Sequence, residues 1–418
     1  MKQIDYKLFF TIFALIIFGS ITISSVSVYP SHNVTQKMVD RWEIEQAYNY
    51  FYVIKNIIHV IIWLTIIWIF SKIHYKIYEK NFKYIFILAY GLLLAVFIPW
   101  IWVEIKWATW WIDLKFLPFF IQPTEFMKIA LIVFLAAFFK IYQKKLKSFK
   151  YWFLAFLGII FVAILPIWMQ PDFWTILVLF PISVIMFFLA WANLKHLWIT
   201  FLIWLFIIFW VYFSGKYDKE NPETRNKLSY ITERFDIFLQ DNKLLFDKWQ
   251  ITKDNNYQIK QALVTVWSWW FWWVGFGNSI QKFWYLPEVQ WDFIFSVIVE
   301  ELGFMWAFVL LNIFLYIWYR WFLIWFLTKD IFAKLTAYWI TSWILLQAFI
   351  NIWVNLNILP LTWITLPFIS YWGSSLLALS IWVWILLNIS RWVDFSQSIF
   401  DSNHRKTIRK SKLRTRSL

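Results

Sequence analysis

Long, nearly uninterrupted runs of apolar residues recur along this chain and constrain its fold more than any other feature. A helix needs roughly 20 mostly apolar residues to cross the hydrocarbon core of a bilayer. Ten segments approach or exceed that length: 8–28, 51–70, 83–101, 123–142, 151–169, 173–191, 197–213, 292–319, 331–354 and 371–390. Because 61% of the residues are hydrophobic and only 15% are charged, a water-soluble fold would expose too much apolar surface. We therefore expect an all-α, polytopic membrane protein of about ten transmembrane helices.

Basic residues in the short loops predict how these helices are oriented. The loops 71–83 and 140–150 and the segment after residue 400 are rich in Lys and Arg, whereas the loop 29–50 mixes both signs. By the positive-inside rule, the basic loops lie in the cytoplasm. They share one side if there are ten spans, so we expect both termini inside. We therefore attribute the net charge of +15 to membrane topology and to attraction by anionic lipid rather than to nucleic-acid binding.

We expect one transmembrane domain over residues 1–392, in the bacterial cytoplasmic membrane, followed by a basic cytoplasmic tail at 393–418. No small-residue cleavage pattern follows the first apolar run, so we expect it to remain as a signal anchor. The hydrophilic segment 214–260 would form a long extracytoplasmic loop between helices 7 and 8, which is either functional or a flexible linker. The apolar segment 263–283 after it is a candidate re-entrant segment. With no cysteine, the chain has no disulfide framework.

Ionisable residues beside the predicted spans are the first candidates for function, because a charge at the bilayer centre costs about 2.5–3.5 kcal/mol on insertion scales. Glu125 and Lys128 open the fourth span and are three residues apart, so they share a helix face. They form either a local ion pair or a polar groove for a charged head group. Asp172 precedes the sixth span, where it can cap the helix, contact a substrate, or do both.

A second group of carboxylates surrounds the start of the predicted eighth span: Glu288, Asp292, Glu300 and Glu301. The first two lie at the outer mouth of that span, and the other two lie two to three turns deeper. Carboxylates at the mouth can simply face water. Facing a water-filled cavity, they could instead deprotonate a hydroxyl or hold a divalent cation through oxygen ligands.

Hydroxyl groups open the last span in the string LPFISYWGSS, which contains Ser370, Tyr371, Ser374 and Ser375. They could contact sugar or phosphate, or they could be small residues that allow close helix packing. The scattered histidines disfavour a zinc site, and no P-loop or dinucleotide fingerprint is present. We therefore expect no nucleotide cofactor.

Four strings occur in the order found in a known family: IQPTEFMKIALIVFLA, QPDFWTILVL, the stretch from YQIKQALVTVW to FSVIVEELGF, and LPLTWITLPFISYWGSSLL. Together they resemble the SEDS family, whose members include FtsW and RodA, over residues 120–392. The strings NSIQKFWYLPE and LTWITLPFISYWGSS are more similar to the cell-division type, FtsW, than to the elongation type. The first 110 residues match only in hydropathy.

The resemblance implies a glycosyltransferase that polymerises lipid II into peptidoglycan strands outside the membrane, with undecaprenyl pyrophosphate as leaving group. It implies a divalent cation, Mg or Mn, with no ligands identified, and a class B penicillin-binding protein and other divisome proteins as partners. It places the catalytic aspartate at Asp292. The substrate-binding residues that we predict are Glu125, Lys128, Asp172, Glu288, Ser370 and Ser374. A lipid II transporter and a non-catalytic scaffold for the transpeptidase remain alternatives.

The counts of tryptophan and glycine depart from the pattern of that family. The chain has 35 Trp and 8 Gly. Several Trp stand where the family has glycine: Trp174, Trp267, Trp269, Trp270, Trp306, Trp363 and Trp372. Glycine permits positive φ and close backbone approach, whereas clustered indoles would make a rigid block. We hypothesise that many of these residues are UGA codons that encode glycine in the host and were translated as tryptophan. A protein truly rich in tryptophan is the alternative.

Overall fold

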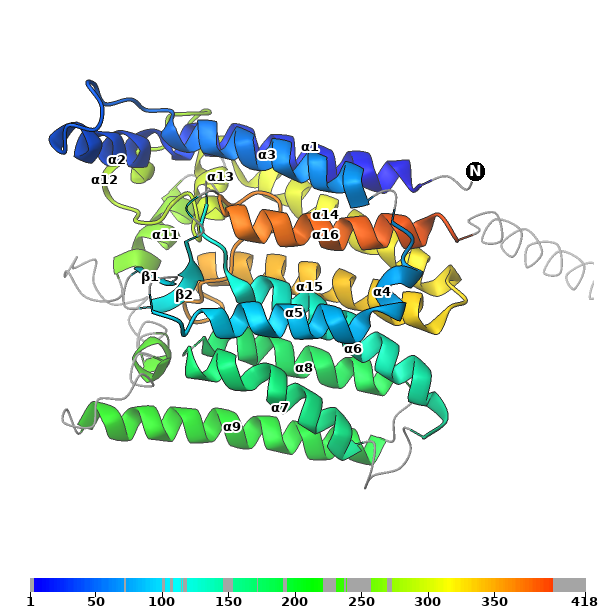
Figure 1. Ribbon diagram of the computed structural model, residues 1–418. Coiled ribbons are helices and arrows are strands. Elements are labelled where there is room, and N and C mark those ends of the chain that lie inside the picture. The colour runs from blue at the N-terminus through cyan, green and yellow to red at the C-terminus, as the bar shows by residue number, and fades with distance from the viewer. Residues whose placement is uncertain are drawn as a thin grey trace, which may run out of the picture.

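The computed structural model describes residues 4–70, 73–99, 102–105, 108–113, 115, 119–145, 153–170, 172–190, 194–220, 231–236, 238, 257–268 and 273–393. Long helices run side by side through these residues (Figure 1). The elements in chain order are α1 (Tyr6–Val26), α2 (Val28–Asp40), α3 (Phe51–Phe70), α4 (Lys76–Lys80), α5 (Phe82–Ala95), β1 (Trp102–Ile105), β2 (Ala108–Ile112), α6 (Pro123–Tyr142), η1 (Gln143–Lys145), α7 (Leu154–Met169), α8 (Phe173–Leu189), α9 (Leu194–Glu220), α11 (Tyr257–Ser268), α12 (Gln281–Trp284), α13 (Ile294–Leu302), α14 (Phe304–Leu327), α15 (Ile331–Asn355) and α16 (Gly373–Ser390).

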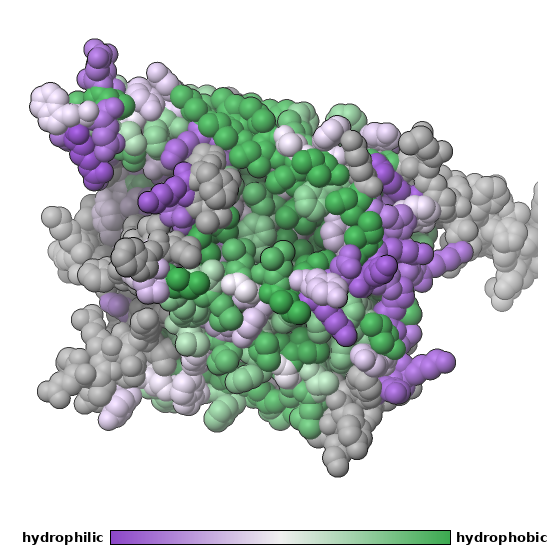
Figure 2. All heavy atoms as spheres, viewed as in Figure 1, coloured by the Kyte–Doolittle hydropathy of each residue, from purple (hydrophilic) through white to green (hydrophobic). Residues whose placement is uncertain are grey.

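The apolar helices explain why this chain belongs in a membrane. Among the described residues, six helices are long and apolar enough to cross one: α1, α3, α9, α14, α15 and α16. Large apolar side chains such as Phe10, Leu88 and Phe206 are more than half exposed on the outside of the bundle. Figure 2 shows that such residues form a broad band, with hydrophilic residues gathered toward its two ends. This pattern confirms the predicted helical membrane fold, while the number of spans stays a prediction.

The centre of the bundle is formed by α6, α15 and α16, whose side chains are largely buried. Helix α15 packs against α14, α6, α16 and α8, and α3 packs against α16 and α1. Helices α3 and α9 are mostly exposed and lie at the edges of the bundle (Figure 1). The buried central helices therefore hold the groups that position a site, and the outer helices face lipid.

Both described ends of the chain lie at the same end of the bundle, which we call the termini end. The backbone N–H of Asp5 donates to Ser390 Oγ at 3.1 Å, just before α1 and at the last residue of α16. The basic residues of α4 and the last turn of α6 lie there too (Figure 1). This agrees with an even number of spans, and the orientation in the membrane remains a prediction. The opposite end, with the β1–β2 hairpin, is called the cavity end.

One of the ten predicted spans is wrong. The segment 292–319 is divided into two helices, α13 and α14, at Gly303, and α14 then continues to Leu327. Gly303 has φ of +80°, a left-handed conformation that L side chains rarely adopt, so the helix breaks there. Glu300 and Glu301 therefore lie on the short helix α13 and not deep inside a membrane-spanning helix.

The connections at the cavity end hold more regular structure than the sequence indicated. The predicted loop 29–50 contains the helix α2, and the antiparallel strands β1 and β2 lie between α5 and α6. Helix α9 extends to Glu220, past its predicted end at 213, so the predicted loop 214–260 begins as a helix. The segment 263–283 comprises the end of α11, residues 273–280 and part of α12, while 269–272 lie outside the described residues. The tail 394–418 also lies outside them.

Candidate active site

A cavity of about 600 Å³ opens at the cavity end of the bundle. Its walls come from α3, β2, α6, α8, α15 and the loops that precede α13 and α16. It contains five of the predicted site residues: Glu125, Lys128, Asp172, Glu288 and Asp292. Three clusters that are far apart in sequence thus meet in one space, which makes this cavity the candidate active site.

Glu125 and Lys128 lie in the first turns of α6. Pro123 begins the helix, where its missing N–H costs no hydrogen bond, and an acidic residue in the first turn suits the positive end of the helix dipole. Lys128 Nζ lies 2.6 Å from Glu125 Oε1, so the predicted ion pair forms. Lys128 also lies 4.7 Å from the centre of the Trp343 ring. The pair is largely buried and still borders the cavity, so both predicted roles are compatible.

Asp172 caps α8, as the sequence indicated. Its carboxylate accepts hydrogen bonds from the backbone N–H of Thr175 at 3.2 Å and from Thr175 Oγ1 at 2.7 Å. Burial raises the pKa of Asp172, and the bonds from Thr175 and the charge of Lys128 act against that rise. Asp172 and Thr175 both line the cavity, so the cap also presents polar oxygens to it.

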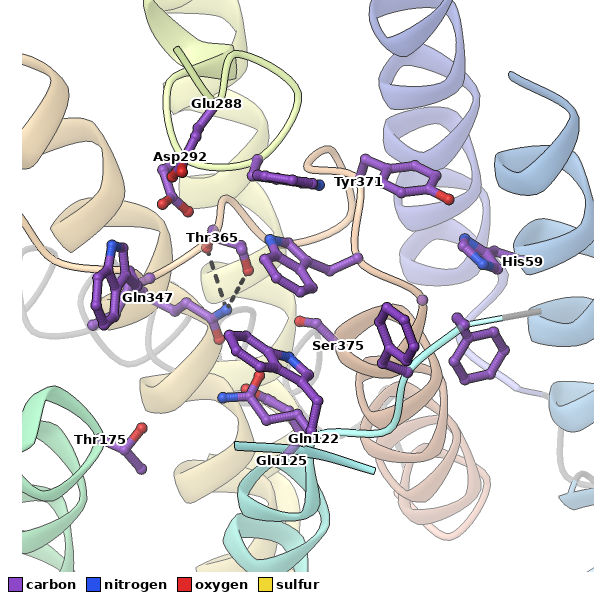
Figure 3. A pocket seen from close by; sticks show the side chains of 18 of the residues that line it. His59, Gln122, Glu125, Thr175, Glu288, Asp292, Gln347, Thr365, Tyr371 and Ser375 are labelled. Carbon is purple, nitrogen blue, oxygen red and sulfur yellow. Dashed lines mark hydrogen bonds between the residues drawn. The ribbon is translucent and has the colours of Figure 1, made fainter. Parts of the chain in front are cut away.

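Glu288 and Asp292 lie on the loop that leads into α13. The backbone N–H of Asp292 donates to the carbonyl of Glu288 at 3.2 Å, which closes one turn between them. Figure 3 shows both side chains on one side of the cavity and Gln122 and Glu125 on another. Glu288 has φ of +58°, an uncommon conformation for a residue other than glycine. The loop is thus held in a conformation that brings both carboxylates to the same wall.

Four helices begin at this cavity: α6, α8, α13 and α16. Each contributes lining residues from its first turn or from the residues just before it, including Gln122, Asp172, Asp292 and Gly373. No side-chain cap satisfies the first turn of α6 or of α16. Helix N-termini carry partial positive charge and free N–H groups, so their convergence favours an anionic ligand.

The serines that open α16 have different environments. Ser370 Oγ accepts a hydrogen bond from the backbone N–H of Leu366 at 2.9 Å, which closes a turn outside the cavity lining. Ser374 is buried and also lies outside the lining, whereas Ser375 lines the cavity. A Cβ at Gly373 would come within 2.6 Å of Phe119 and 2.9 Å of His59 Nε2, so this position requires glycine. The predicted roles of Ser370 and Ser374 in binding stay untested.

Sequence reasoning missed several polar residues of the lining. Lys55 and His59 lie on α3, four residues apart, and both border the cavity. Two ionisable residues at helical spacing inside an apolar span were the signal that could have identified them. Gln347 and Thr365 also line the cavity, and they carry no charge that would mark them in a sequence (Figure 3). Tyr371 lines it too, and the sequence had already indicated that hydroxyl.

Glu300 and Glu301 do not line the cavity. Ser279 Oγ donates to Glu300 at 2.5 Å. Lys282 Nζ lies 2.6 Å from Glu301 and also donates to Ser25 Oγ on α1, and all of these groups are buried. The two carboxylates thus fasten the loop before α13 to α1 and α13.

Indole rings occupy much of the cavity wall: Trp111, Trp174, Trp291, Trp343, Trp363 and Trp372. Trp372 stacks on Trp111 at 5.9 Å between ring centres and lies 5.5 Å from the ring of Trp291. Trp174, Trp363 and Trp372 are positions where the resemblance implies glycine. With glycine there, the cavity would be wider and its polar wall more accessible.

A second cavity, of about 470 Å³, lies between α7, α8 and α9 and reaches Ile231 and Phe235. Its lining is almost entirely apolar. Trp174 borders both cavities, so the apolar space adjoins the polar one at that residue. Within the described part of the chain, no group of three or more His, Cys, Asp or Glu residues is arranged to hold a metal ion by itself.

Known proteins are similar to this chain in sequence. The model of the FtsW, RodA and SpoVE family, described as cell cycle protein, matches residues 6–394. The probable peptidoglycan glycosyltransferase FtsW of Wigglesworthia glossinidia brevipalpis is 32% identical over 352 residues, 83% of this chain and 83% of that protein. The stage V sporulation protein E of Bacillus subtilis is 31% identical over 304 residues, 73% of this chain and 77% of that protein.

Solved structures share the fold. A chain from a study of the structural coordination of polymerization and crosslinking by a peptidoglycan synthase complex superposes with a TM-score of 0.67 at 19% identity, over 93% of this chain and 98% of that one. The rod shape determining protein RodA of Thermus thermophilus gives a TM-score of 0.60 at 19% identity, over 94% and 98%. At these identities the likeness concerns the fold alone.

Proposed function

This chain belongs to the FtsW, RodA and SpoVE family of cell cycle proteins, and we propose that it polymerises lipid II into peptidoglycan glycan strands. The reaction takes place at the outer face of the cytoplasmic membrane, during cell division. The observation that carries the proposal is the convergence of Glu125, Lys128, Asp172, Glu288 and Asp292 on one cavity. Relatives named as probable peptidoglycan glycosyltransferases give the reaction class.

Asp292 acts as the general base. The hydroxyl oxygen of the acceptor sugar attacks the anomeric carbon of the donor, and Asp292 takes the hydroxyl proton. A glycosidic bond forms while the bond from the anomeric carbon to the pyrophosphate oxygen breaks, and undecaprenyl pyrophosphate leaves with the electron pair. The main chain of Asp292 is fixed by surrounding hydrogen bonds, which supports a base held at one place in the cavity wall.

The pyrophosphate of the leaving group lies near the starts of α6 and α16. The N–H groups of their first turns have no side-chain cap, and Lys128 and Lys55 add positive charge to the same cavity. Donors and cations fixed before the reaction stabilise negative charge as it builds on the leaving oxygen. Glu125 keeps Lys128 in place through their ion pair.

A divalent cation, Mg or Mn, fits the donor set of the cavity. Five carboxyl groups and two lysines line it, so a pyrophosphate would otherwise meet excess negative charge. Magnesium is commonly held by one or two carboxylates together with substrate phosphates. Glu125 and Asp172, which lie near Lys128 and the start of α6, would hold the cation, which would neutralise charge on the pyrophosphate when bound.

The apolar cavity between α7, α8 and α9 accommodates part of the polyprenyl chain of lipid II. Its lining has almost no polar surface, and it adjoins the polar cavity at Trp174. A lipid with a polar head and a long apolar tail needs such a pair of adjacent spaces. Because the tail would move from lipid into an apolar space, packing contacts would hold it there rather than removal from water.

A class B penicillin-binding protein, which crosslinks the new strands, is the partner that we propose, together with other divisome proteins. The structural likeness to a chain of a peptidoglycan synthase complex supports this choice. One segment of the predicted outer loop lies close to the site, because Arg234 stacks on Trp363 at 4.3 Å and donates to the carbonyl of Leu361 at 2.8 Å. A partner that contacts this loop could influence the cavity wall.

Two other functions, a lipid II transporter and a non-catalytic scaffold, make different demands on the structure. A transporter would need charged groups along a route through the membrane, and the candidates for that role, Glu300 and Glu301, are instead bonded to Ser279 and Lys282. A scaffold would need no carboxylate at position 292. A scaffold does not explain why the ionisable residues meet in one cavity.

Purified protein in liposomes, supplied with lipid II, tests the proposal. Two parents are assayed, one with the printed sequence and one with glycine at the positions where the family has it, each beside Asp292→Ala. Glycan strands from a parent and none from Asp292→Ala would establish a polymerase that depends on Asp292. A parent that makes no strands, with or without the transpeptidase, would favour the transporter or the scaffold. Strands from Asp292→Ala at the parental rate would contradict the role of Asp292.

A further inference from the structure

Three amide side chains follow one face of α15 at intervals of four residues: Gln347, Asn351 and Asn355. All are buried. Residues four apart on a helix lie one above the other, so these side chains form a column along α15. Asn351 and Asn355 do not line the cavity, whereas Gln347 does. The column faces the two loops that carry the cavity's polar wall.

The carbonyl oxygen of Asp292 is held by two of these amides at once. Asn351 Nδ2 donates to it at 3.0 Å, and Asn355 Nδ2 donates to it at 2.9 Å. A carbonyl oxygen has two lone pairs, so this pair of bonds saturates it. The two amides therefore fix the peptide plane that follows the candidate base.

Asn355 also holds the start of α13. Its Oδ1 accepts from the backbone N–H of Ser296 at 3.2 Å and from Ser296 Oγ at 2.7 Å. The first of these bonds satisfies one free N–H in the first turn of α13, which has no cap from its own preceding side chain. Asp292 is thus held between α15 and the start of α13.

The same column fastens the loop that precedes α16. Asn351 Nδ2 donates to the carbonyl of Ile364 at 2.8 Å, and Gln347 Nε2 donates to the carbonyl and Oγ1 of Thr365, each at 3.2 Å. The two loops also meet directly, because the N–H of Tyr371 donates to the carbonyl of Gln290 at 2.9 Å. One helix face therefore sets the relative position of two walls of the cavity.

We propose that Asn351 and Asn355 are positioning residues for the reaction, which hold the main chain of Asp292 so that its carboxylate reaches the acceptor hydroxyl. The inference rests on the proposed function. Glu288, at the start of the same loop, has φ of +58°, so this loop needs outside bonds to keep its conformation. Small displacements of a catalytic group are costly to rate even when substrate binding is intact.

The test compares Asn351→Asp and Asn355→Asp with a matched control, Asn388→Asp. Asn388 is a buried asparagine of α16 at the termini end, where it donates to the carbonyl of Ile73 at 2.6 Å and accepts from the N–H of Tyr75 at 3.0 Å. All three exchanges keep the shape of the side chain and replace an amide donor by a carboxyl group. The control therefore reports the cost of the exchange away from the cavity.

Lipid II polymerisation in liposomes is measured for each variant with the amount of folded protein matched. We expect Asn351→Asp and Asn355→Asp to lower kcat by about 10- to 100-fold with KM nearly unchanged, and Asn388→Asp to keep the parental kcat. If Asn355→Asp does not fold, Asn351→Ser is measured in addition. This exchange removes one of the two amides that donate to the Asp292 carbonyl and leaves Asn355 in place. We therefore expect a loss of kcat smaller than about 10- to 100-fold.

Two results would overturn the inference. One is a parental kcat in both cavity-end variants, and the other is an equal loss of kcat in Asn388→Asp. Asp292→Ala in the same assay separates this failure from failure of the proposed function. If Asp292→Ala is inactive and both asparagine variants are fully active, only the positioning role is contradicted. If Asp292→Ala is active, the role of Asp292 as the general base is contradicted.

Discussion

Paired charged residues occur at both ends of the bundle, and they behave differently. At the termini end, Arg320 donates twice to Asp5, and Lys140 pairs with Glu79 and Asp330. These groups join helices to one another. At the cavity end, Lys128 and Asp172 are just as well bonded, yet they also border an open space of about 600 Å³. Burial and pairing alone therefore do not identify a functional charge. A cavity beside the pair does not either, because Asp330 lines a space of about 460 Å³ at the termini end. The distinguishing feature of the cavity end is that buried charged residues from separate segments of the chain meet in one space.

The comparison is tested most strongly by one lysine from each end. Lys128→Met removes the positive charge next to the cavity, together with the Nζ that lies 4.7 Å from the centre of the Trp343 ring, and keeps an apolar side chain of similar length. We expect the polymerisation rate to fall by about 10²- to 10³-fold, the usual cost of one group that stabilises developing negative charge. The rate is measured with lipid II at saturation and folded protein matched.

Lys140→Met is the matched exchange at the termini end. Lys140 is about one-third exposed, so we expect a loss of stability of about 1 kcal/mol or less and a parental rate per folded molecule. Equal losses of rate in the two variants would show that the distinction between the ends is wrong.

Asp5→Ala tests the structural role of the termini end. Asp5 is buried, binds Arg320 at 2.7 Å and caps α1 through the N–H of Leu8 at 3.2 Å. Removing one partner of a buried pair leaves the other charge uncompensated, so we expect stability to fall by about 3 kcal/mol. Thermal unfolding in detergent measures this, and the rate of the remaining folded protein should stay parental. A lower rate without lower stability would contradict the assignment.

A tryptophan of the cavity wall gives a further test of the comparison between the two ends. Trp372→Gly removes a ring that stacks on Trp111 and lies against Trp291 within the cavity. We expect this variant to polymerise lipid II about tenfold faster, which corresponds to roughly 1.4 kcal/mol in the barrier. A slower rate in a stable, folded Trp372→Gly protein would contradict the idea that the ring obstructs the site.

Hydrogen bonding separates two kinds of tryptophan, and this bears on the recoding hypothesis. Trp343 Nε1 donates to Gln347 Oε1 at 3.1 Å, whereas the buried N–H groups of Trp174, Trp339 and Trp372 have no partner among the described residues. A buried indole N–H usually finds a partner. We expect mass spectrometry of the protein from its own host to find tryptophan at 343 and glycine at 372. Tryptophan at both positions would end the hypothesis.

Much of the fold could be read from hydropathy, because a membrane-spanning helix needs little more than length and apolar composition. The predicted spans 51–70 and 123–142 agree with α3 and α6 at both ends. The break at Gly303 was missed because α13 is as apolar as a span and only the backbone conformation reveals the division. Helix α2 was missed because its mean hydropathy is far below that of a membrane span.

The candidate site could be predicted as separate clusters and not as one cavity. Glu125, Asp172 and Asp292 stood out as charges beside apolar spans, and their meeting depends on how α6, α8 and α15 pack. Asn351 and Asn355 gave no such signal, because an uncharged amide in an apolar helix resembles many other buried polar residues. Their role depends on contacts across the fold, which no local pattern contains.

The central claim is that the cavity end performs chemistry at Asp292, and Asp292→Asn tests it most directly. This exchange keeps the size of the side chain and removes its ability to accept the hydroxyl proton. We expect the polymerisation rate in liposomes to fall by about 10²- to 10⁴-fold while thermal stability stays parental. Glycan strands formed at the parental rate by folded Asp292→Asn protein would contradict the account.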